Sequence, residues 1–152
     1  MLDLNSKAPD FMLDGSDGKK HGLDEFAGKY LVLYFYPKDD TPGCTIEAKG
    51  FNAKLEEIEM LGAKIVGVSS DNYESHCKFR DKYGLKFLLL SDPTHEMIKK
   101  YDAYGDKGIF GFGVFRKTYI IDKKGNIAKI YPKVNPAGHE SEIIDFIKAD
   151  KS

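Results

Sequence analysis

Apolar residues along the chain form continuous runs that are typical of buried strands. Residues 30–36 are apolar or aromatic throughout and end at a proline, which predicts a strand buried on both faces. Residues 63–68 predict a second buried strand, and residues 86–90 predict a third. Because parallel strands are covered by helices on both sides, these runs indicate a sheet in the interior of the molecule.

Helical periodicity separates these strands. After a turn at residues 38–43, apolar residues recur at steps of three and four from Cys44 to Ile58 and predict a helix. Residues 72–83 predict a second helix, which ends at Gly84. A third helix is predicted over residues 92–101.

The C-terminal part of the chain has a different pattern. Residues 102–115 contain four glycines and no clear period, which predicts a loop. Residues 117–122 and 127–131 flank a Lys-Lys-Gly-Asn turn and predict a hairpin, and residues 141–148 predict a closing helix. This order predicts an α/β sandwich, in which helices flank a mixed central sheet, and the length favours one domain over residues 1–152.

Charge and cysteine content exclude several classes of function. The 23 basic and 24 acidic residues are interspersed, so we expect neither a nucleic acid nor a membrane as partner. Cys44 and Cys77 are too few for a disulfide scaffold and lack the spacing of a zinc site, so we expect no metal and no cofactor. Without a recognisable signal peptide, the chain is expected in the cytoplasm, where thiols stay reduced.

Cys44 lies at a predicted junction between the end of a strand and the beginning of a helix. Sheets of this class place their ligand sites at such strand ends. The helix dipole and the free N–H groups of the first turn stabilise a thiolate over a thiol. Thr41, three residues earlier, can place a hydroxyl beside the sulfur. Position alone is equally compatible with a small buried core residue.

The residues around Cys44 resemble the active-site signature of the peroxiredoxins. Pro37, Thr41 and Cys44 match the pattern Pro-x-x-x-Thr-x-x-Cys, and the surrounding residues resemble the Q-type subgroup, the bacterioferritin comigratory proteins. The likeness spans nearly the whole chain, with matching segments at residues 8–11, 66–69, 90–92 and 116–122. It implies a thioredoxin-like fold and a peroxidase that reduces hydrogen peroxide and organic hydroperoxides through a cysteine sulfenic acid, recycled by thioredoxin or another thiol.

The resemblance also implies roles for individual residues. Cys44 would be the peroxidatic nucleophile, Thr41 would offer its hydroxyl to the peroxide oxygens, and Pro37 would shield the site from water. Arg116 would stabilise the thiolate and the charge that develops on the peroxide, although arginine is otherwise most often a surface residue. Glu47 matches a recurring position of the subgroup, and compensation of the helix N-terminal charge is an alternative role.

One departure from the subgroup concerns the second thiol. Many Q-type members carry a resolving cysteine five residues after the nucleophile, where this chain has Lys49. Some members place it on the next helix, near the position of Arg80, and Cys77 lies one turn before that position. Either Cys77 resolves the sulfenic acid after a helix end unwinds, because a disulfide needs Cα atoms within about 7 Å, or an external thiol does so.

Other functions fit the sequence less well. A thioredoxin-type reductase needs Cys-x-x-Cys, which is absent, and a cysteine hydrolase needs a histidine base, which none of the four scattered histidines is placed to supply. The glycines of residues 105–113 lack the strand–glycine–helix order of a phosphate loop. The alternative from another class is a non-enzymatic redox sensor or holdase with the same reactive thiol. The expected partners are a peroxide and a thiol reductant such as thioredoxin, with the chain a monomer or weak homodimer.

Overall fold

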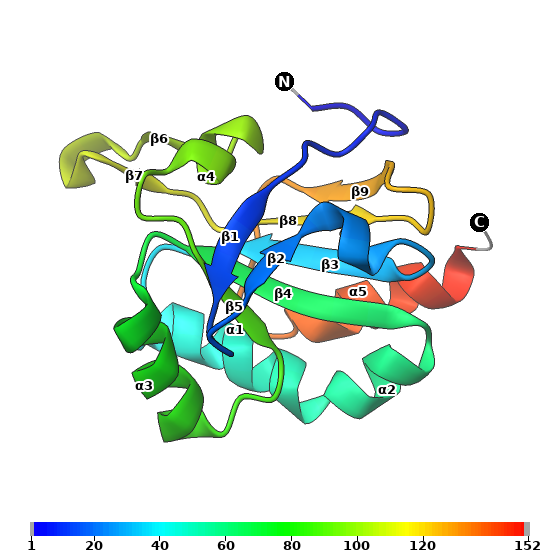
Figure 1. Ribbon diagram of the computed structural model, residues 1–152, viewed down its shortest axis with the longest axis horizontal. Helices are drawn as coiled ribbons and strands as arrows, with labels where there is room; N and C mark the ends of the chain where they lie inside the picture. Colours follow the sequence, from blue (N-terminus) through cyan, green and yellow to red (C-terminus); the bar gives the residue numbers. More distant parts are fainter. Residues whose placement is uncertain (1, 151–152) are drawn as a thin grey trace.

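A computed structural model describes residues 2–150, which are arranged about a central sheet (Figure 1). The strands of this sheet are β1 (Met12–Gly15), β2 (Lys20–Gly22), β3 (Tyr30–Phe35), β4 (Ala63–Ser69), β5 (Leu88–Ser91), β8 (Lys117–Ile121) and β9 (Ile127–Tyr131). Their order across the sheet is β2-β1-β5-β4-β3-β8-β9. Strands β3, β4 and β5 are parallel neighbours, whereas the pairs β3–β8, β8–β9, β1–β5 and β1–β2 are antiparallel. The predicted mixed sheet is therefore confirmed.

Helices cover both faces of the sheet. One face is covered by α1 (Pro42–Ala53), α2 (Leu55–Met60), α3 (Tyr73–Tyr83) and α5 (His139–Ala149), and α4 (Glu96–Lys100) lies on the other (Figure 1). The predicted helix from Cys44 to Ile58 is interrupted at Lys54, where α1 ends and α2 begins. The α/β sandwich follows the alternation of strands and helices along the chain.

Strand β3 lies inside the sheet, between β4 and β8, and is buried on both faces, which explains why its sequence is continuously apolar. Val32 and Tyr34 pack into the core cluster beneath α1, α2, α3 and α5. Leu31, Leu33 and Phe35 pack into the cluster on the opposite face, with side chains from α4 and the N-terminal segment. Successive side chains of a strand point to opposite faces, so both sets are buried.

Residues 102–115 are not the structureless loop that the glycines predict. They form a small second sheet, in which β6 (Tyr104–Asp106) pairs antiparallel with β7 (Phe112–Val114), and a short 3-10 helix, η2 (Gly108–Phe110), joins the two strands. Gly108 and Gly111 have positive φ and allow this turn. The strands are only three residues long and rich in glycine, so their alternation is too short to detect in the sequence.

The structure differs from the sequence analysis in two further places, a shorter helix and a hairpin that was not predicted. The predicted helix over residues 92–101 is shorter, because His95 is left-handed (φ 63°) and α4 begins only at Glu96. Asp92 still contributes to this helix, since its carboxylate accepts a hydrogen bond from the backbone N–H of Ile98 (2.8 Å). The edge hairpin β1–β2 was not predicted, because its short strands lack a clear apolar alternation.

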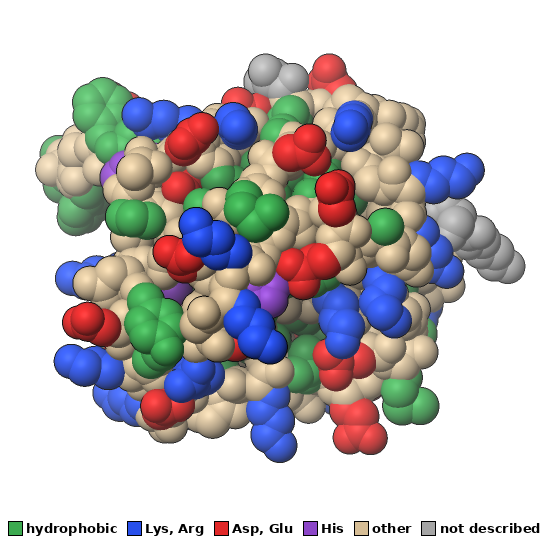
Figure 2. Space-filling view, viewed as in Figure 1, with side chains coloured by type: hydrophobic (Ala, Val, Ile, Leu, Met, Phe, Trp, Pro, Cys, Tyr) green, Lys and Arg blue, Asp and Glu red, His purple; other side chains and the backbone are tan. Residues whose placement is uncertain are grey.

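The surface carries charges of both signs, interspersed over the face seen in Figure 2. A group of exposed apolar side chains lies on the β6–β7 hairpin, where Ile109, Phe110 and Phe112 are 95%, 81% and 71% exposed. No helix in the described part of the chain has the length and apolar character needed to cross a membrane.

Candidate active site

Cys44 lies at the point where β3 ends and α1 begins. Thr41 is the N-cap residue of α1, with extended backbone (φ −95°, ψ 157°), and Pro42 occupies the first helical position, where its missing N–H costs nothing. Cys44 therefore falls in the first turn, as predicted, where the positive end of the helix dipole favours an anionic sulfur. Its side chain is only 1% exposed and packs in the cluster that contains Tyr34 and Ala48.

Arg116 lies just before β8, the strand that pairs with β3, and its side chain contacts Cys44. Strands β3 and β8 are antiparallel neighbours, with Phe35 opposite Lys117, so the residue before Lys117 lies beside the end of β3. The Nη2 group of Arg116 donates to the Cys44 sulfur at 3.3 Å. Arg116 is half-buried, and although burial lowers its pKa, the negative charges of Cys44 and Glu47 raise it overall. A guanidinium in this position keeps its charge and stabilises the thiolate.

Glu47 lies one helical turn after Cys44, on the same face of α1. Its Oε1 accepts a hydrogen bond from Nη1 of Arg116 at 2.8 Å, and its side chain is fully buried. Burial raises the pKa of Glu47 to about 7, even though the charge of Arg116 and its hydrogen bond act in the opposite direction. A charge that only compensated the helix dipole would be exposed to solvent, so the burial of Glu47 does not fit that alternative.

Tyr34 belongs to the same buried group and was missed by the sequence analysis. Burial, followed by the charges of Glu47 and Cys44, raises the pKa of Tyr34 well above its usual 10, so the hydroxyl keeps its proton. Among residues 2–150, neither this hydroxyl nor Oε2 of Glu47 has a hydrogen-bond partner. The sequence signal was a tyrosine in the middle of a strand that is buried on both faces, where a hydroxyl is costly.

Thr41 and Pro37 lie in the segment before Cys44, and both are partly exposed. The Thr41 hydroxyl donates to the carbonyl oxygen of Lys38 at 2.9 Å and makes no capping hydrogen bond. Its oxygen lone pairs consequently stay available as acceptors. Pro37 and Arg116 line a groove of about 600 Å³, which is bounded by Lys107, Phe115, Pro132, Lys133, Val134 and Asn135.

Gly43 makes the approach of Arg116 possible. A Cβ atom at this position would lie 2.9 Å from Nη2 of Arg116 and 3.6 Å from Cγ of Pro136. A side chain here would push the guanidinium away from the sulfur. The residue before Cys44 is therefore a glycine because any side chain there would collide with Arg116.

Cys77 does not join this group. It lies on α3, half-buried, and its thiol faces the carbonyl oxygen of Ser16 at 3.6 Å and the hydroxyl of Tyr73, whose pKa this contact raises. The structure therefore does not bring Cys77 into contact with Cys44, and both thiols are free. The guanidinium of Arg80 also reaches Ser16, so a cation lies near this thiol as well.

Lys49, at the position of the subgroup's resolving cysteine, is exposed and points toward α3. Its ammonium lies 5.7 Å from the centre of the Tyr83 ring. The Tyr83 hydroxyl donates to Asp40 of the loop before α1 at 2.7 Å. Lys49 thus contributes to the contact between α1 and α3 instead of supplying a thiol.

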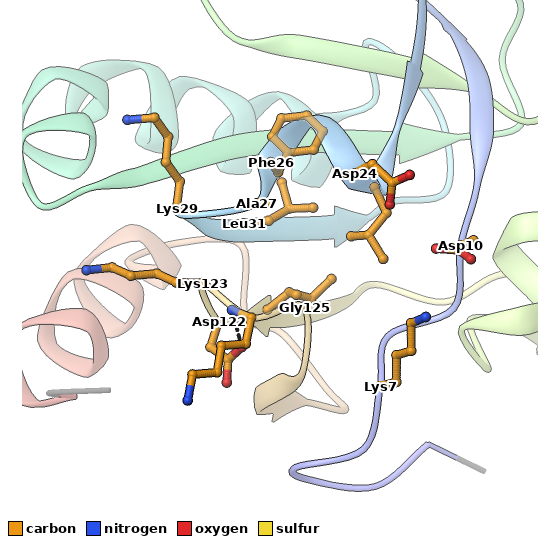
Figure 3. A pocket seen from close by; sticks show the side chains of 13 residues that line it. Lys7, Asp10, Asp24, Phe26, Ala27, Lys29, Leu31, Asp122, Lys123 and Gly125 are labelled. Atoms are coloured by element: carbon orange, nitrogen blue, oxygen red, sulfur yellow. Dashed lines mark hydrogen bonds between the residues drawn. The ribbon is translucent and has the colours of Figure 1, made fainter.

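A second hollow, of about 390 Å³, lies at the opposite end of β3 (Figure 3). Leu31 and the turn between β8 and β9 line it, and the charged side chains around it include Lys7, Asp24 and Lys123. None of the residues predicted for the site lines this hollow. The candidate chemistry therefore lies at the carboxyl end of β3.

Comparison with known proteins identifies the family of the chain. The AhpC/TSA family matches residues 4–130. The chain is similar to peroxiredoxin Bcp of Bacillus subtilis, with 43% identity over 150 residues that cover 97% of this chain and 96% of the relative. It is 42% identical to a putative peroxiredoxin bcp of Helicobacter pylori, over 96% of this chain and 98% of the relative.

Solved structures show the same fold. The bacterioferritin comigratory protein of Xanthomonas campestris, studied for alkyl peroxide reduction activity, has a TM-score of 0.91 at 38% identity, covering 97% of this chain and 98% of its own. A cysteine-to-serine mutant of PrxQ from Xylella fastidiosa has a TM-score of 0.94 at 31% identity, covering 98% of this chain and 97% of its own. The thioredoxin-like peroxiredoxin fold implied by the sequence is thereby confirmed.

Proposed function

Since the chain belongs to the AhpC/TSA family of peroxiredoxins and is a thiol-dependent peroxidase, we propose that Cys44 is its peroxidatic residue. The observation that carries this proposal is the 3.3 Å contact between Nη2 of Arg116 and the sulfur of Cys44, in the first turn of α1. A fixed cation and a helix N-terminus act together on one sulfur. Both favour the thiolate, which is the nucleophilic form.

In the proposed reaction, the Cys44 thiolate attacks the terminal oxygen of a hydroperoxide, ROOH. An S–O bond forms, the O–O bond breaks, and the cysteine becomes a sulfenic acid. The leaving RO⁻ takes a proton from solvent and departs as ROH, so the sulfur is oxidised and the peroxide reduced. Arg116 stabilises the negative charge as it moves from sulfur to the leaving oxygen.

The surrounding residues hold the peroxide and the cation. The Thr41 hydroxyl donates a hydrogen bond to the carbonyl oxygen of Lys38, so its oxygen is free to accept a hydrogen bond from the O–H of the peroxide. Glu47 holds Nη1 of Arg116 and leaves Nη2 directed at the sulfur. Pro37 borders the groove beside Arg116 and keeps water from the thiolate. These roles rest on the contacts described and on the positions that match the family.

For the second half of the cycle, we propose that Cys77 resolves the sulfenic acid. Cys44 and Cys77 are the two thiols of the chain, and Lys49 closes the route through the same helix. The thiol of Cys77 is half-buried against Ser16, so a helix must move before the sulfurs can meet. The resulting disulfide would be reduced by an external thiol such as thioredoxin.

We further propose that the chain acts as one domain, as a monomer or weak homodimer in the cytoplasm. Interspersed surface charges and two free thiols support this assignment. A non-enzymatic sensor or holdase is the less favoured alternative, because full-length relatives are named peroxiredoxins. Peroxide consumption separates the two, since a sensor stops after one equivalent and an enzyme with a thiol reductant continues.

The test of the proposed function is the variant Cys44→Ser. We expect peroxide turnover to be lost with the fold intact, because serine is nearly isosteric and carries no thiolate. Turnover is measured with a thiol reductant, and circular dichroism checks the fold. Retention of more than a few per cent of the activity, as an order of magnitude for a lost nucleophile, would assign the reaction to Cys77.

A further inference from the structure

Asp39 is a buried carboxylate in the loop that leads to Cys44. It is 7% exposed and lies between Pro37 and Thr41, two residues from each. A loop residue of this kind is expected in solvent, because burying a carboxylate is costly unless it is paired and hydrogen-bonded. The burial of Asp39 therefore needs a specific set of partners.

The partners of Asp39 come from the residue that follows β3, from the segment before α3 and from α3 itself. Oδ1 accepts a hydrogen bond from the Tyr36 hydroxyl at 2.6 Å. Oδ2 accepts one from the Ser75 hydroxyl at 2.8 Å and one from Nδ1 of His76 at 2.7 Å. The backbone N–H of Asp39 donates to Asp71 at 2.8 Å. Burial and the charge of Asp39 raise the pKa of Tyr36 well above its usual 10, so its hydroxyl remains a donor.

His76 forms a buried ion pair with Asp39. Its side chain is fully buried, and its other ring nitrogen, Nε2, lies 2.9 Å from the carbonyl oxygen of Leu90 on β5. A carbonyl oxygen and a carboxylate are both acceptors, so each ring nitrogen of His76 faces a group that accepts hydrogen bonds. Replacing a buried ion pair with apolar residues is often neutral or stabilising. Stability alone is consequently a poor explanation for this pair.

The ion pair fixes the loop in space. His76 is anchored to the sheet through Leu90 and to α3 through the backbone, so it holds Asp39 at a defined position. The next residue, Asp40, has a left-handed backbone (φ 57°) and is held by Lys82 and Tyr83 of α3. The Thr41 hydroxyl in turn bonds to Lys38 of the same loop. Displacement of Asp39 would therefore move both Pro37 and Thr41.

We propose that His76, acting through Asp39, is a positioning residue for the reaction of Cys44. The pair holds the loop of residues 37–44 so that the Thr41 oxygen and the edge of Pro37 meet the peroxide at the sulfur. This role rests on the proposed function of Cys44. A misplacement of about 1 Å in such a site lowers rates by up to about a hundredfold.

A metal-binding role is less well supported by the same residues. Ligand atoms of Asp39, Asp71 and His76 lie within 4.8 Å of one another. However, Nδ1 of His76 is engaged with Asp39, and Asp71 accepts hydrogen bonds from the Asp39 backbone and from Ser69. These atoms already have hydrogen-bond partners within the protein.

The test compares the reaction of Cys44 with peroxide and its alkylation by iodoacetamide. The rate of alkylation depends on the fraction of thiolate and on how easily the reagent reaches the sulfur. The rate with peroxide depends in addition on the position of the loop of residues 37–44. In His76→Phe, we expect the peroxide rate constant to fall between about tenfold and a hundredfold, while alkylation is unchanged or faster. Leu85→Ala is the matched control, because Leu85 is buried just after α3 and its apolar side chain cannot hydrogen-bond to Asp39. It should lose stability and keep the peroxide rate.

A second pair of variants keeps the test independent of the folding of His76→Phe. In Asp39→Asn, the amide donates to a neutral His76 and its oxygen still accepts from Tyr36, so the loop should keep its position. We expect its peroxide rate within about threefold of the wild type and a loss of about tenfold or more in Asp39→Ala, as for other positioning contacts.

Two results would overturn the positioning role. One is a peroxide rate for His76→Phe equal to that of Leu85→Ala, together with equal rates for Asp39→Asn and Asp39→Ala. The other is a parallel loss of peroxide and alkylation rates, which would mean that the pair supports the thiolate instead of the loop. Cys44→Ser is measured alongside: if it stays active, the nucleophile itself is wrongly assigned, whereas an inactive Cys44→Ser confines the failure to His76.

Discussion

At the residue scale, the guanidinium of Arg116 donates hydrogen bonds to two acceptors. Nη2 faces the sulfur of Cys44 at 3.3 Å, and Nη1 faces Oε1 of Glu47 at 2.8 Å. The planar guanidinium has donors in a fixed arrangement, so the hydrogen bond to Glu47 orients the one to the sulfur. A lysine at this position would offer a point charge without that orientation.

The first residue-scale prediction concerns the charge of Arg116. In Arg116→Met, the midpoint of the pH dependence of iodoacetamide labelling should rise by about one pH unit or more, because a nearby opposite charge is lost. The rate with peroxide should fall on the order of a hundredfold. Lys117→Met is the matched control, since the Lys117 ammonium donates to the Asp102 carbonyl oxygen and lies over Tyr119. An unchanged midpoint in Arg116→Met would remove Arg116 from the site.

The second prediction follows from the pKa of Glu47, which burial raises from 4.5 to about 7. Between these two values the folded protein keeps a proton on Glu47 that the unfolded chain has lost. The stability that this proton contributes is complete below pH 4.5 and is lost as the pH rises through 7. The side chain in Glu47→Gln cannot ionise. Between pH 4.5 and 7, the free energy of unfolding should therefore fall less in this variant than in the wild type, and the difference should be on the order of 2 kcal/mol.

Urea unfolding of both proteins at several pH values across this window measures the difference. The comparison is between the slopes of stability against pH, because any effect of Glu47→Gln on packing that does not depend on pH leaves the slope unchanged. Parallel pH dependences for wild type and variant would show that Glu47 ionises normally in the folded protein.

At the scale of elements, helices α1 and α3 hold the two cysteines apart. Loop residues before α1 bind α3 through Asp39 and Asp40, and Lys49 of α1 lies over Tyr83 of α3. The Asn52 side chain also donates to the carbonyl of Gly84, just after α3, at 3.0 Å. These contacts oppose the movement that a disulfide between Cys44 and Cys77 requires.

The third prediction concerns that movement. One equivalent of peroxide should give a disulfide between Cys44 and Cys77, which intact-mass analysis detects as a loss of two hydrogens. The oxidised protein should lose hydrogen-exchange protection in α1 or α3, because one helix end must unwind. In Cys77→Ser, the sulfenic acid should live longer and over-oxidise to sulfinic acid at high peroxide.

A gain-of-function control is available for this prediction. Lys49→Cys in the Cys77→Ser background places a thiol where many Q-type members carry theirs, and it should suppress over-oxidation. If wild type forms no internal disulfide and accumulates sulfinic acid like Cys77→Ser, the protein is a one-cysteine enzyme with an external resolving thiol.

At the scale of the whole molecule, both core clusters contain side chains of strand β3. Its side chains enter one cluster on each face of the sheet, so the two clusters are mechanically linked. Strand β3 also pairs with β4 on one side and with β8 on the other. Loosening β3 should therefore affect all parts of the molecule together.

The fourth prediction tests this linkage. Leu33→Ala, at a fully buried position of β3, should lower the free energy of unfolding by about 2–5 kcal/mol. Unfolding should stay a single transition, shifted to lower urea, as expected for one domain. Ile46→Ala, at a half-exposed position on α1, serves as the control and should change stability little. Two separate transitions would contradict the assignment of a single domain.

The sequence by itself determined the features that depend on local periodicity. Continuous apolar runs predicted β3 and β4 to within a residue, and Gly84 marked the end of α3 correctly, with its left-handed backbone. The position of Cys44 in the first turn of a helix was also readable, because a strand, a proline and a helical pattern follow one another within a few residues.

Only the tertiary structure decided which distant side chains meet. Arg116 is 72 residues from Cys44, and they meet because β8 pairs antiparallel with β3. His76 had no function in the sequence, because its partner Asp39 lies 37 residues away in what reads as an exposed turn. Periodicity reports which face of an element is buried, whereas charge pairs depend on how elements are paired and stacked. That pairing is a property of the whole sheet and is not encoded in any one segment.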